Sequence, residues 1–471
     1  MNKTVDFINP RLIENDLKEA RQTSQEQIKK IIEKARLAKG LSPLETAVLL
    51  EVTDPALKEE IFKAAHEIKE KIYGKRIVIF APLYLSNYCV NNCVYCGYRH
   101  ANDICRRKLT MDEIREEVKI LEKMGHKRLA IEAGEDPINC PLDYVLEAIK
   151  VIYETSEDQG SIRRVNVNIA ATSVEEYRKL KEAGIGTYIL FQETYHQETY
   201  EKMHPAGPKA SYYYHTTAMD RAMEAGIDDV GFGVLFGLYD YKFEVLALLY
   251  HALHLEKVFG VGPHTISVPR LRPATGVSID QFPYLVKDEE FKMIVAVLRL
   301  AVPYTGIILS TRENPEFRDE VIALGVSQIS AGSCTGVGAY KKEFQEKNKV
   351  EKKNQNTAQF EVGDHRTPDE ILASLCKSGY LPSYCTACYR QGRTGDRFMQ
   401  LAKSGNIANV CQPNAILTFQ EYLLDYASPE TREIGEKTIN NFLADIPNNN
   451  IKALTEEKLA RIKKGERDLY L

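Results

Sequence analysis

From residue 76 onward, short apolar runs rich in β-branched residues alternate with longer amphipathic segments. In the longer segments apolar residues recur every three or four positions, which predicts helices with one buried face. Two of these helices begin with capping boxes, at Thr110 and at Ser173, where a hydroxyl and a later carboxylate bind free amides of the first turn. The runs predicted as strands are 76–80, 128–132, 165–170, 187–191, 230–236, 265–268, 307–310 and 328–331.

Eight strands that alternate with helices predict an α/β fold, a closed parallel (β/α)8 barrel of the TIM type. A doubly wound open sheet is the structural alternative. We expect the barrel over residues 76–340, preceded by an N-terminal helical extension over 1–75, where the pattern is charged and helical. A charged, amide-rich connector is predicted at 341–365, and a helical C-terminal domain at 366–471.

The composition is that of an ordinary globular protein, with 44% hydrophobic and 27% charged residues among 471. A formal net charge of -4 gives no general attraction to nucleic acid or to an anionic membrane, and we expect neither as a partner. No apolar run is long enough to span a bilayer, and the first residues do not resemble a signal peptide. Ten cysteines in such a chain indicate metal ligands and reduced thiols, and a cytoplasmic location.

Three cysteines lie close together directly after the first predicted strand. Cys89, Cys93 and Cys96 have the spacing C-x3-C-x2-C on one short loop. Three thiolates can bind three corners of a cubane iron–sulfur cluster, which normally takes four cysteines, so one iron stays open for a ligand. Zinc and disulfide pairing are the alternatives, but no fourth ligand at finger spacing completes a zinc site. A loop after a barrel strand is also where a barrel places its chemistry.

A second cysteine set follows the connector. Cys385 and Cys388 form a C-x2-C pair, and Cys411 comes after a predicted helix at 396–403. We expect all three in loops at helix ends, with Pro413 starting the next helix. Three thiols again leave one corner open, which favours a second iron–sulfur cluster, and zinc is the competing interpretation. The cysteines expected to be small buried residues are Cys105, Cys140, Cys334 and Cys376.

The first triad, with the aromatic Tyr95 before its last cysteine, resembles the signature of the radical S-adenosylmethionine (SAM) superfamily. The resemblance implies that the open iron chelates SAM and that the reduced cluster cleaves it to a 5′-deoxyadenosyl radical. It also implies that Tyr95 packs near the adenine and that the backbone at Tyr98 reads the adenine edge.

Other strand ends carry parts of the same family pattern. Ala133, Gly134 and Glu135 resemble the Gly-Gly-Glu motif that holds the SAM amino group, with alanine replacing the first glycine. A turn beside a helix explains these three residues equally well. The stretch 231–237 resembles the family's glycine-containing adenine motif, although glycine in a strand also marks a bulge. The further residues that the resemblance suggests for SAM binding are Asn168, Gln192, Glu193, Gly233 and Gly237. For Asn168, Gln192 and Glu193 the alternative is that they are polar barrel residues satisfied by each other.

Polar groups also follow the sixth and seventh predicted strands. Arg270, Arg272 and Arg312 can each hold a carboxylate through two hydrogen bonds, and Ser310 precedes the last of them. These residues favour an anionic or amino-acid substrate, and a structural role is the alternative for each arginine.

The barrel together with the C-terminal cysteines is similar to one family over essentially the whole chain, the FeFe-hydrogenase maturases called HydG. The barrel alone also looks like the thiazole-pathway tyrosine lyase ThiH, which lacks the second cysteine set. The resemblance implies that L-tyrosine is cleaved at Cα–Cβ to p-cresol and dehydroglycine. Dehydroglycine is then converted at the second cluster to carbon monoxide and cyanide for the hydrogenase active site, the H-cluster.

The same resemblance implies two 4Fe-4S clusters and SAM as cofactors, with an extra iron held by His264 and a free cysteine beside the second cluster. It implies a reductant such as flavodoxin or ferredoxin and other hydrogenase maturases as partners. The alternatives are a thiazole-pathway tyrosine lyase with a structural C-terminal metal site, a non-catalytic iron–sulfur carrier, and a zinc-stabilised barrel aldolase or lyase.

Overall fold

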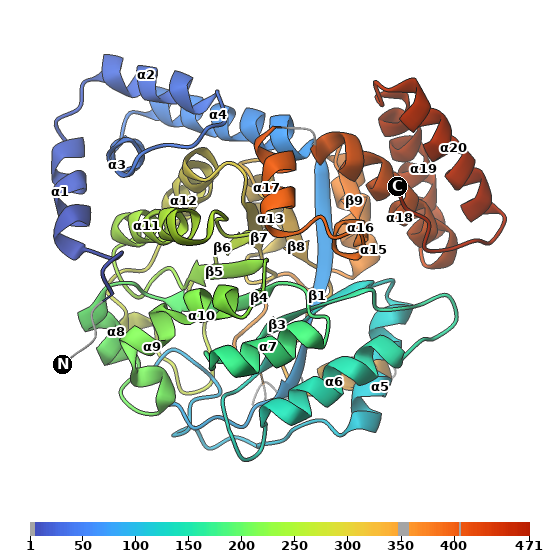
Figure 1. Ribbon diagram of the computed structural model, residues 1–471, viewed down its shortest axis with the longest axis horizontal. Coiled ribbons are helices and arrows are strands. Elements are labelled where there is room, and N and C mark those ends of the chain that lie inside the picture. The colour runs from blue at the N-terminus through green and yellow to red at the C-terminus, as the bar shows by residue number, and fades with distance from the viewer. Residues whose placement is uncertain (1–4, 347–357, 405–406) are drawn as a thin grey trace.

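Eight parallel strands close into a barrel in the computed structural model, which describes residues 5–346, 358–404 and 407–471 (Figure 1). Neighbouring strands follow in sequence order from β2 to β8, and β1 pairs with both β8 and β2 to close the ring. The barrel strands are β1 (Arg76–Ser86), β2 (Arg128–Ala133), β3 (Arg164–Asn168), β4 (Tyr188–Glu193), β5 (Val230–Val234), β6 (Thr265–Ser267), β7 (Gly306–Leu309) and β8 (Gln328–Ser330). The predicted (β/α)8 barrel is confirmed.

The first strand is longer than the pattern predicted, and its extra length ties three parts of the molecule together. Residues 81–86 of β1 pair with β2, residues 78–80 with β8, and residues 76–78 with a ninth strand, β9 (Leu381–Ser383). The sequence did not predict β9, which is only three residues long and contains Pro382. Through β9 the segment that follows the connector joins the amino end of the barrel.

Helices surround the strands, and the predicted caps explain where several of them begin. Thr110 and Ser173 make the expected capping boxes at α5 (Met111–Lys123) and α7 (Val174–Glu182). Gly125 has a φ of +86°, the left-handed conformation that returns the chain from α5 to β2. The other helices of the barrel are α6 (Leu142–Glu154), α8 (Gln197–Met203), α9 (Tyr212–Thr216), α10 (Ala218–Glu224), α11 (Tyr241–Phe259), α12 (Asp288–Ala301), α13 (Pro315–Ile322) and α14 (Ala339–Glu346), with 3-10 turns η1 (Pro208–Ala210) and η2 (Ile279–Gln281).

Four helices precede the barrel, as the charged amphipathic pattern predicted. They are α1 (Pro10–Ala20), α2 (Gln25–Ala35), α3 (Pro43–Leu50) and α4 (Pro55–Tyr73). Helix α4 packs against α12, and α1 packs against α3 and α11, so the extension covers one side of the barrel (Figure 1). Among the helices of the described residues, none combines the length and the apolar composition that crossing a membrane requires.

The connector predicted at 341–365 is only partly a connector. Its first residues belong to α14, residues 347–357 lie outside the described residues, and residues from 358 onward pack on the barrel. The segments that follow are α15 (Pro368–Lys377), α16 (Ala387–Arg390), α17 (Gly395–Lys403), α18 (Ile407–Asp425), α19 (Pro429–Ala444) and α20 (Asn449–Lys463).

The prediction that Pro413 starts a helix is wrong. Helix α18 begins at Ile407 and continues through Pro413, which therefore lies in the helix interior. Proline costs the helix one backbone hydrogen bond there. Buried apolar residues that follow it, among them Ile416 and Leu417, keep the helix packed in the core.

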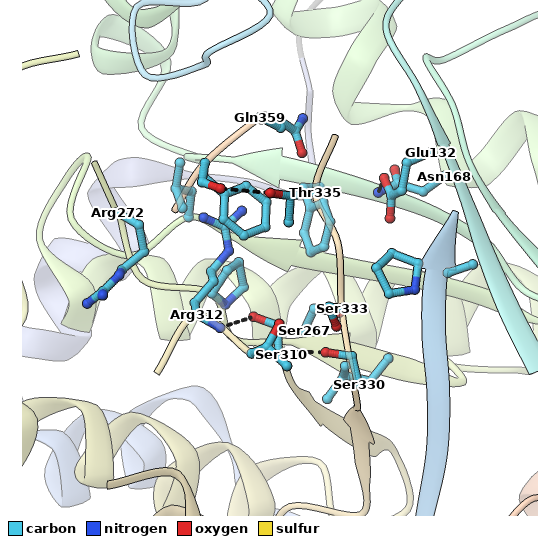
Figure 2. A pocket seen from close by; sticks show the side chains of 18 of the residues that line it. Glu132, Asn168, Ser267, Arg272, Ser310, Arg312, Ser330, Ser333, Thr335 and Gln359 are labelled. Carbon is cyan, nitrogen blue, oxygen red and sulfur yellow. Dashed lines mark hydrogen bonds between the residues drawn. The ribbon is translucent and has the colours of Figure 1, made fainter. Parts of the chain in front are cut away.

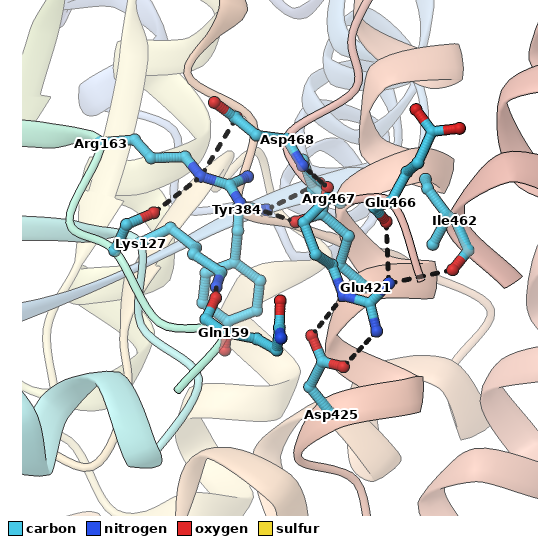
Figure 3. Close-up of polar contacts among 12 residues, drawn as sticks. Lys127, Gln159, Arg163, Tyr384, Glu421, Asp425, Ile462, Glu466, Arg467 and Asp468 are labelled. Carbon is cyan, nitrogen blue, oxygen red and sulfur yellow. Dashed lines mark hydrogen bonds and ion pairs between the residues drawn. The ribbon is translucent and has the colours of Figure 1, made fainter. Parts of the chain in front are cut away.

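An ion-pair network fastens α18 to the barrel (Figure 3). Arg163, just before β3, donates to Glu421 on α18 at 2.9 Å, and both side chains are buried. Glu421 also accepts from the backbone of Asp468, and Arg467 is paired with Asp425. Figure 3 shows Arg163, Glu421, Asp425, Arg467 and Asp468 in one cluster.

Candidate active site

Three cavities lie inside the barrel and at its two ends. The central cavity, of about 140 Å³, contains Glu132, Ser310 and Arg312 at the carboxyl ends of strands. The loop cavity, of about 120 Å³, lies against the first cysteine loop, and the two share Tyr95, Cys96, Glu132, Asn168, Phe191, Glu193 and Gln359. The lower cavity, of about 50 Å³, lies at the amino ends of the strands and contains the second cysteine set.

The first cysteine loop follows β1 and is fixed by Asn87. The Asn87 amide donates to the carbonyl of Cys105 at 2.9 Å and accepts from the backbone N–H of Arg107 at 2.7 Å, which closes the loop on itself. Cys89, Cys93 and Cys96 all line the loop cavity. The prediction that Cys105 is buried is wrong: Cys105 is exposed, and its carbonyl is the acceptor of the Asn87 amide.

Burial controls the protonation of two of these thiols. It raises the pKa of Cys93 to about 12 and that of Cys96 to about 11, so both are protonated at neutral pH when no metal is bound. Iron would have to displace these protons, as a thiolate is the form that binds metal. Lys209 lies nearby, and although burial opposes it, Glu193 and Cys93 raise the pKa of Lys209 above its usual range. This lysine supplies fixed positive charge beside the loop.

The Ala133–Glu135 turn lies directly on the cysteine loop. The backbone N–H of Val90 donates to the carbonyl of Glu135, and Gly134 donates to the carbonyl of Ser86. A Cβ on Gly134 would lie 2.3 Å from the carbonyl oxygen of Tyr88, so no side chain fits there. The turn and the cysteines therefore face one cavity, and the Glu135 carboxylate is held by the Asn91 amide at 2.5 Å.

Two acidic groups lie at the junction of the loop and central cavities. Glu132 accepts a hydrogen bond from the Asn168 amide at 2.6 Å, and burial raises the pKa of Glu132 to about 8. Glu193 is ion-paired with Lys209 at 2.8 Å and has a φ of +68°, a conformation that non-glycine residues seldom adopt. Glu132, Glu193 and Tyr95 each line both cavities.

Of the other predicted SAM contacts, some line the cavities and some do not. Tyr98 lines the loop cavity, and its hydroxyl donates to the carbonyl of Thr335 at 2.9 Å. Gln192 lines none of the three cavities, because its amide donates to Thr216 at 2.9 Å. Gly233 and Gly237 also lie outside these linings. Gly233 allows close packing, since a Cβ there would lie 2.5 Å from the carbonyl oxygen of Ser267.

The structure separates the three candidate arginines. Arg270 lies outside the lining of the central cavity, and its guanidinium is held by Glu313 and Asp288. Arg272 and Arg312 do line this cavity, and no ion pair with either is found among the described residues. The Arg312 guanidinium lies over the ring of Phe360, 3.3 Å from its centroid. Figure 2 shows Arg272 on one side of the labelled group, with Glu132 and Asn168 on the opposite side.

Gln359 and Phe360 are site residues that no sequence pattern indicated, because they belong to the segment predicted to be a connector. Gln359 accepts from the Tyr84 hydroxyl at 2.8 Å, and its amide lies 3.9 Å from the Cys96 sulfur. Its backbone carbonyl accepts from Gly97, where a Cβ would lie 2.7 Å from that oxygen. Gly97 after the cysteines was the one signal that another backbone approaches there.

The second cysteine set converges at the opposite end of the barrel. Cys385, Cys388 and Cys411 line the lower cavity. The prediction that all three lie in loops is wrong: Cys388 belongs to the short helix α16, and Cys411 lies within α18. Among the described residues, no group of three or more Cys, His, Asp or Glu side chains converges on a single metal-ion position. The ligands of a cubane bind separate irons and do not need to converge on one point.

The second cysteine set is surrounded by positive charge. Arg76, Arg128 and Arg393 line the same cavity, and each has a buried Nε without a hydrogen-bond partner. The hydrogen bond with Cys388 lowers the pKa of the Cys411 thiol, and the Arg76 guanidinium lowers it further. Three thiolates and an iron–sulfur core carry net negative charge, so buried guanidinium groups whose Nε–H has no partner suit that donor set.

His264, the histidine expected to bind an extra iron, lines the lower cavity. It lies just before β6 and is buried, which lowers its pKa, so the imidazole is neutral at neutral pH. Its Nε2 lies 2.9 Å from the Tyr389 hydroxyl. The lower and central cavities follow one another along the barrel axis. Val78 and Gln328 line the lower cavity, and the residues two positions later on the same strands, Phe80 and Ser330, line the central cavity.

A closed parallel barrel with a cysteine triad after its first strand defines a radical SAM enzyme. A family model described as "Radical SAM superfamily" matches residues 83–249, and one described as "Biotin and Thiamin Synthesis associated domain" matches residues 267–381. The 2-iminoacetate synthase of Escherichia coli (strain K12) is 32% identical over 353 residues, which cover 74% of this chain and 89% of that protein.

Two solved structures extend the similarity to the whole chain. A crystal structure of HydG, described as a maturase of the FeFe-hydrogenase, is 65% identical, covers 99% of this chain and 100% of that chain, and has a TM-score of 0.95. HydG from Carboxydothermus hydrogenoformans is 42% identical, covers 96% and 98%, and has a TM-score of 0.82. The chain therefore belongs to the HydG family of the radical SAM superfamily.

Proposed function

We propose that this enzyme cleaves the Cα–Cβ bond of L-tyrosine to p-cresol and dehydroglycine, and converts dehydroglycine to carbon monoxide and cyanide for assembly of the H-cluster of FeFe-hydrogenase. The observation that carries this proposal is the pair of cysteine-lined cavities at opposite ends of one barrel axis. One cavity suits formation of a radical, and the other suits capture of its products.

The first site fits a 4Fe-4S cluster with bound SAM, which when present would supply the 5′-deoxyadenosyl radical. Cys89, Cys93 and Cys96 would hold the cluster. The backbone around Gly134 would face the SAM amino group, where the absence of a side chain leaves room. Tyr95 provides an aromatic wall shared with the central cavity, and Asn168 and Glu193 are the polar groups within reach of the rest of SAM.

The central cavity suits an aromatic amino acid. Its wall includes the rings of Tyr84, Phe191 and Phe360, which can enclose a phenol ring. Arg272 and Arg312, with guanidinium groups that no carboxylate of the described residues holds, are the proposed carboxylate ligands, with Ser310 beside Arg312. The barrel excludes water and other hydrogen donors, which protects a reactive primary radical.

The lower cavity suits a second 4Fe-4S cluster on Cys385, Cys388 and Cys411. An extra iron would be held by His264 and by a free cysteine molecule. Residues two positions apart on β1, β2 and β8 line the central and lower cavities in turn, so a small product would travel along the axis without leaving the protein. Carbon monoxide and cyanide formed there would meet iron before they reach solvent.

The proposed reaction also needs an electron donor and proteins that receive its product. The radical reaction requires an electron donor, and flavodoxin or ferredoxin is the proposed reductant. The other hydrogenase maturases would receive the iron–carbonyl–cyanide product. Ten cysteines without a disulfide among the described residues suit a cytoplasmic enzyme.

The test is iron and sulfide analysis with EPR on anaerobically reconstituted protein. Wild type should hold about eight cluster irons per chain and give two reduced-cluster signals, of which SAM alters one. A Cys385→Ala/Cys388→Ala double variant should retain about four irons and only the SAM-sensitive signal. Zinc at either triad, or intact SAM after reduction, would overturn the proposal. Wild-type protein that releases p-cresol but no carbon monoxide would favour the thiazole-pathway lyase, with a merely structural C-terminal site.

A further inference from the structure

A buried carboxylate with few partners lies beside the lower cavity. Asp229 directly precedes β5 and is buried. Its Oδ1 accepts from the backbone N–H of Gly395 at 3.2 Å, and its Oδ2 has no hydrogen-bond partner among the described residues. The nearest guanidinium nitrogen, on Arg164, is 3.9 Å away. Burying such a carboxylate is costly, so the position calls for a compensating role.

Asp229 faces one nitrogen of His264. The distance from its Oδ1 to His264 Nδ1 is 3.6 Å, within the range of an ion pair, and Nδ1 has no hydrogen-bond partner among the described residues. A carboxylate can only accept a hydrogen bond, so it favours the tautomer in which Nδ1 carries the proton. Nε2 then keeps its lone pair, which points into the lower cavity. A carboxylate behind a histidine is the arrangement that orients histidines for metal binding.

The lone pair on His264 Nε2 is already in use. The Tyr389 hydroxyl lies 2.9 Å from it and donates to it in this tautomer. The Tyr389 ring is held in turn by Arg164, whose guanidinium carbon lies 2.8 Å from the ring centroid. Tyr389 follows Cys388 directly, and both residues line the lower cavity together with His264.

We propose that Asp229 is a positioning residue that fixes the metal-binding tautomer of His264, and that the Tyr389 hydroxyl holds the Nε2 lone pair that iron would use until iron displaces it. This inference rests on the proposed function, because it takes the extra iron to bind at His264. It adds two residues with opposite effects: Asp229 raises the affinity for iron, and the Tyr389 hydroxyl competes with iron.

The first arm of the test is anaerobic titration of ferrous iron into protein that already carries both clusters. Asp229→Asn should weaken binding of the extra iron about 10–100-fold, the usual effect of losing a partner behind a metal-binding histidine. The asparagine amide can donate to Nδ1 and so favours the wrong tautomer. The matched control is Asp228→Asn at the neighbouring exposed carboxylate, which should bind iron as wild type does. Equal affinities for the two variants would overturn the role of Asp229.

The second arm uses two tyrosines five positions apart in sequence. Tyr389→Phe should bind the extra iron several-fold more tightly, since no hydroxyl then competes for His264 Nε2. Tyr384→Phe is the control, because the Tyr384 hydroxyl is buried without a partner and lies away from His264. Weaker or unchanged binding in Tyr389→Phe would contradict the competition. Loss of the SAM-sensitive EPR signal in Asp229→Asn would show that this variant does not fold. In that case the comparison of Tyr389→Phe with Tyr384→Phe alone tests the inference.

A His264→Ala variant separates this inference from the function on which it rests. If His264→Ala still binds the extra iron as wild type does, His264 is not the ligand and that part of the proposed function is wrong. If His264→Ala loses the iron while Asp229→Asn and Tyr389→Phe behave as their controls do, the proposed iron site survives and only the roles of Asp229 and Tyr389 are wrong.

Discussion

The Arg163 guanidinium donates to the Glu421 carboxylate at 2.9 Å across 258 residues of chain. Arg163 precedes a barrel strand, and Glu421 belongs to the helix that carries Cys411. The pair therefore connects the barrel, which supplies His264, to the helix that supplies a cysteine of the same cavity (Figure 3). The lower cavity exists only where these two parts of the chain are held together.

Breaking this pair should destabilise the fold. Arg163→Met would leave Glu421 buried without its ionic partner, and such a loss costs about 3–5 kcal/mol of unfolding free energy. Denaturant unfolding of the metal-free chain measures it. The exposed Lys437–Glu433 pair provides the control, and Lys437→Met should cause no measurable loss. Similar midpoints for the two variants would show that the buried pair does not stabilise the docking of α18.

Arg312 should determine the affinity for tyrosine. Its guanidinium lines the central cavity without a carboxylate partner among the described residues, so Arg312→Met removes a charged ligand of the substrate carboxylate. A hydrogen bond to a charged group contributes about 1.5–3 kcal/mol, which predicts roughly a 10–100-fold higher dissociation constant for tyrosine. Calorimetry on SAM-loaded protein measures this constant. An unchanged constant would remove Arg312 from the substrate site and leave Arg272 as the candidate.

Glu132 should make stability depend on pH. Burial raises its pKa from 4.5 to about 8, so between these values the folded chain keeps a proton that the unfolded chain has lost. The unfolding free energy therefore falls as pH rises through this window and levels off above it. Glu132→Gln should flatten that slope, measured by unfolding at several pH values. The exposed Glu175→Gln on α7 should keep the wild-type slope. Identical slopes in all three proteins would contradict a neutral Glu132.

Gly134 should be intolerant of a side chain. In Gly134→Ala the new Cβ would lie 2.3 Å from the carbonyl oxygen of Tyr88, so the cysteine loop or the turn has to move. We expect SAM affinity to fall at least about tenfold and the first cluster to assemble incompletely. In Gly184→Ala the new Cβ meets nothing within 4 Å, and the only strain comes from the left-handed backbone at this position. This variant should lose a little stability and keep SAM binding. Equilibrium dialysis with SAM compares the two.

The barrel could be predicted from the sequence because each strand and helix has a recognisable local sequence pattern. Strand periodicity and caps such as Thr110 depend on residues a few positions apart, and all eight strands were found. The cysteine spacing likewise placed Cys89, Cys93 and Cys96 at one strand end. The first strand was predicted at the right place but too short, because Pro82 lies in the part of β1 that follows residue 80.

The remaining site residues depend on contacts that no local pattern contains. Gln359 reaches Tyr84 across 275 residues, and Tyr389 reaches His264 across 125. The sequence alone did not show that Arg270 and Arg312 differ in their availability for substrate. The difference arises because Glu313, 43 positions from Arg270, holds the Arg270 guanidinium. Long-range partners decide whether a polar side chain is free for chemistry.

The most direct measurement of the central claim is the product balance of one anaerobic reaction with reductant, SAM and L-tyrosine. Wild type should release p-cresol together with carbon monoxide and cyanide. The Cys385→Ala/Cys388→Ala variant should release p-cresol at a similar rate without carbon monoxide, because only the site at the amino end of the barrel is lost. Carbon monoxide from the variant, or p-cresol from neither protein, would contradict a two-site tyrosine lyase.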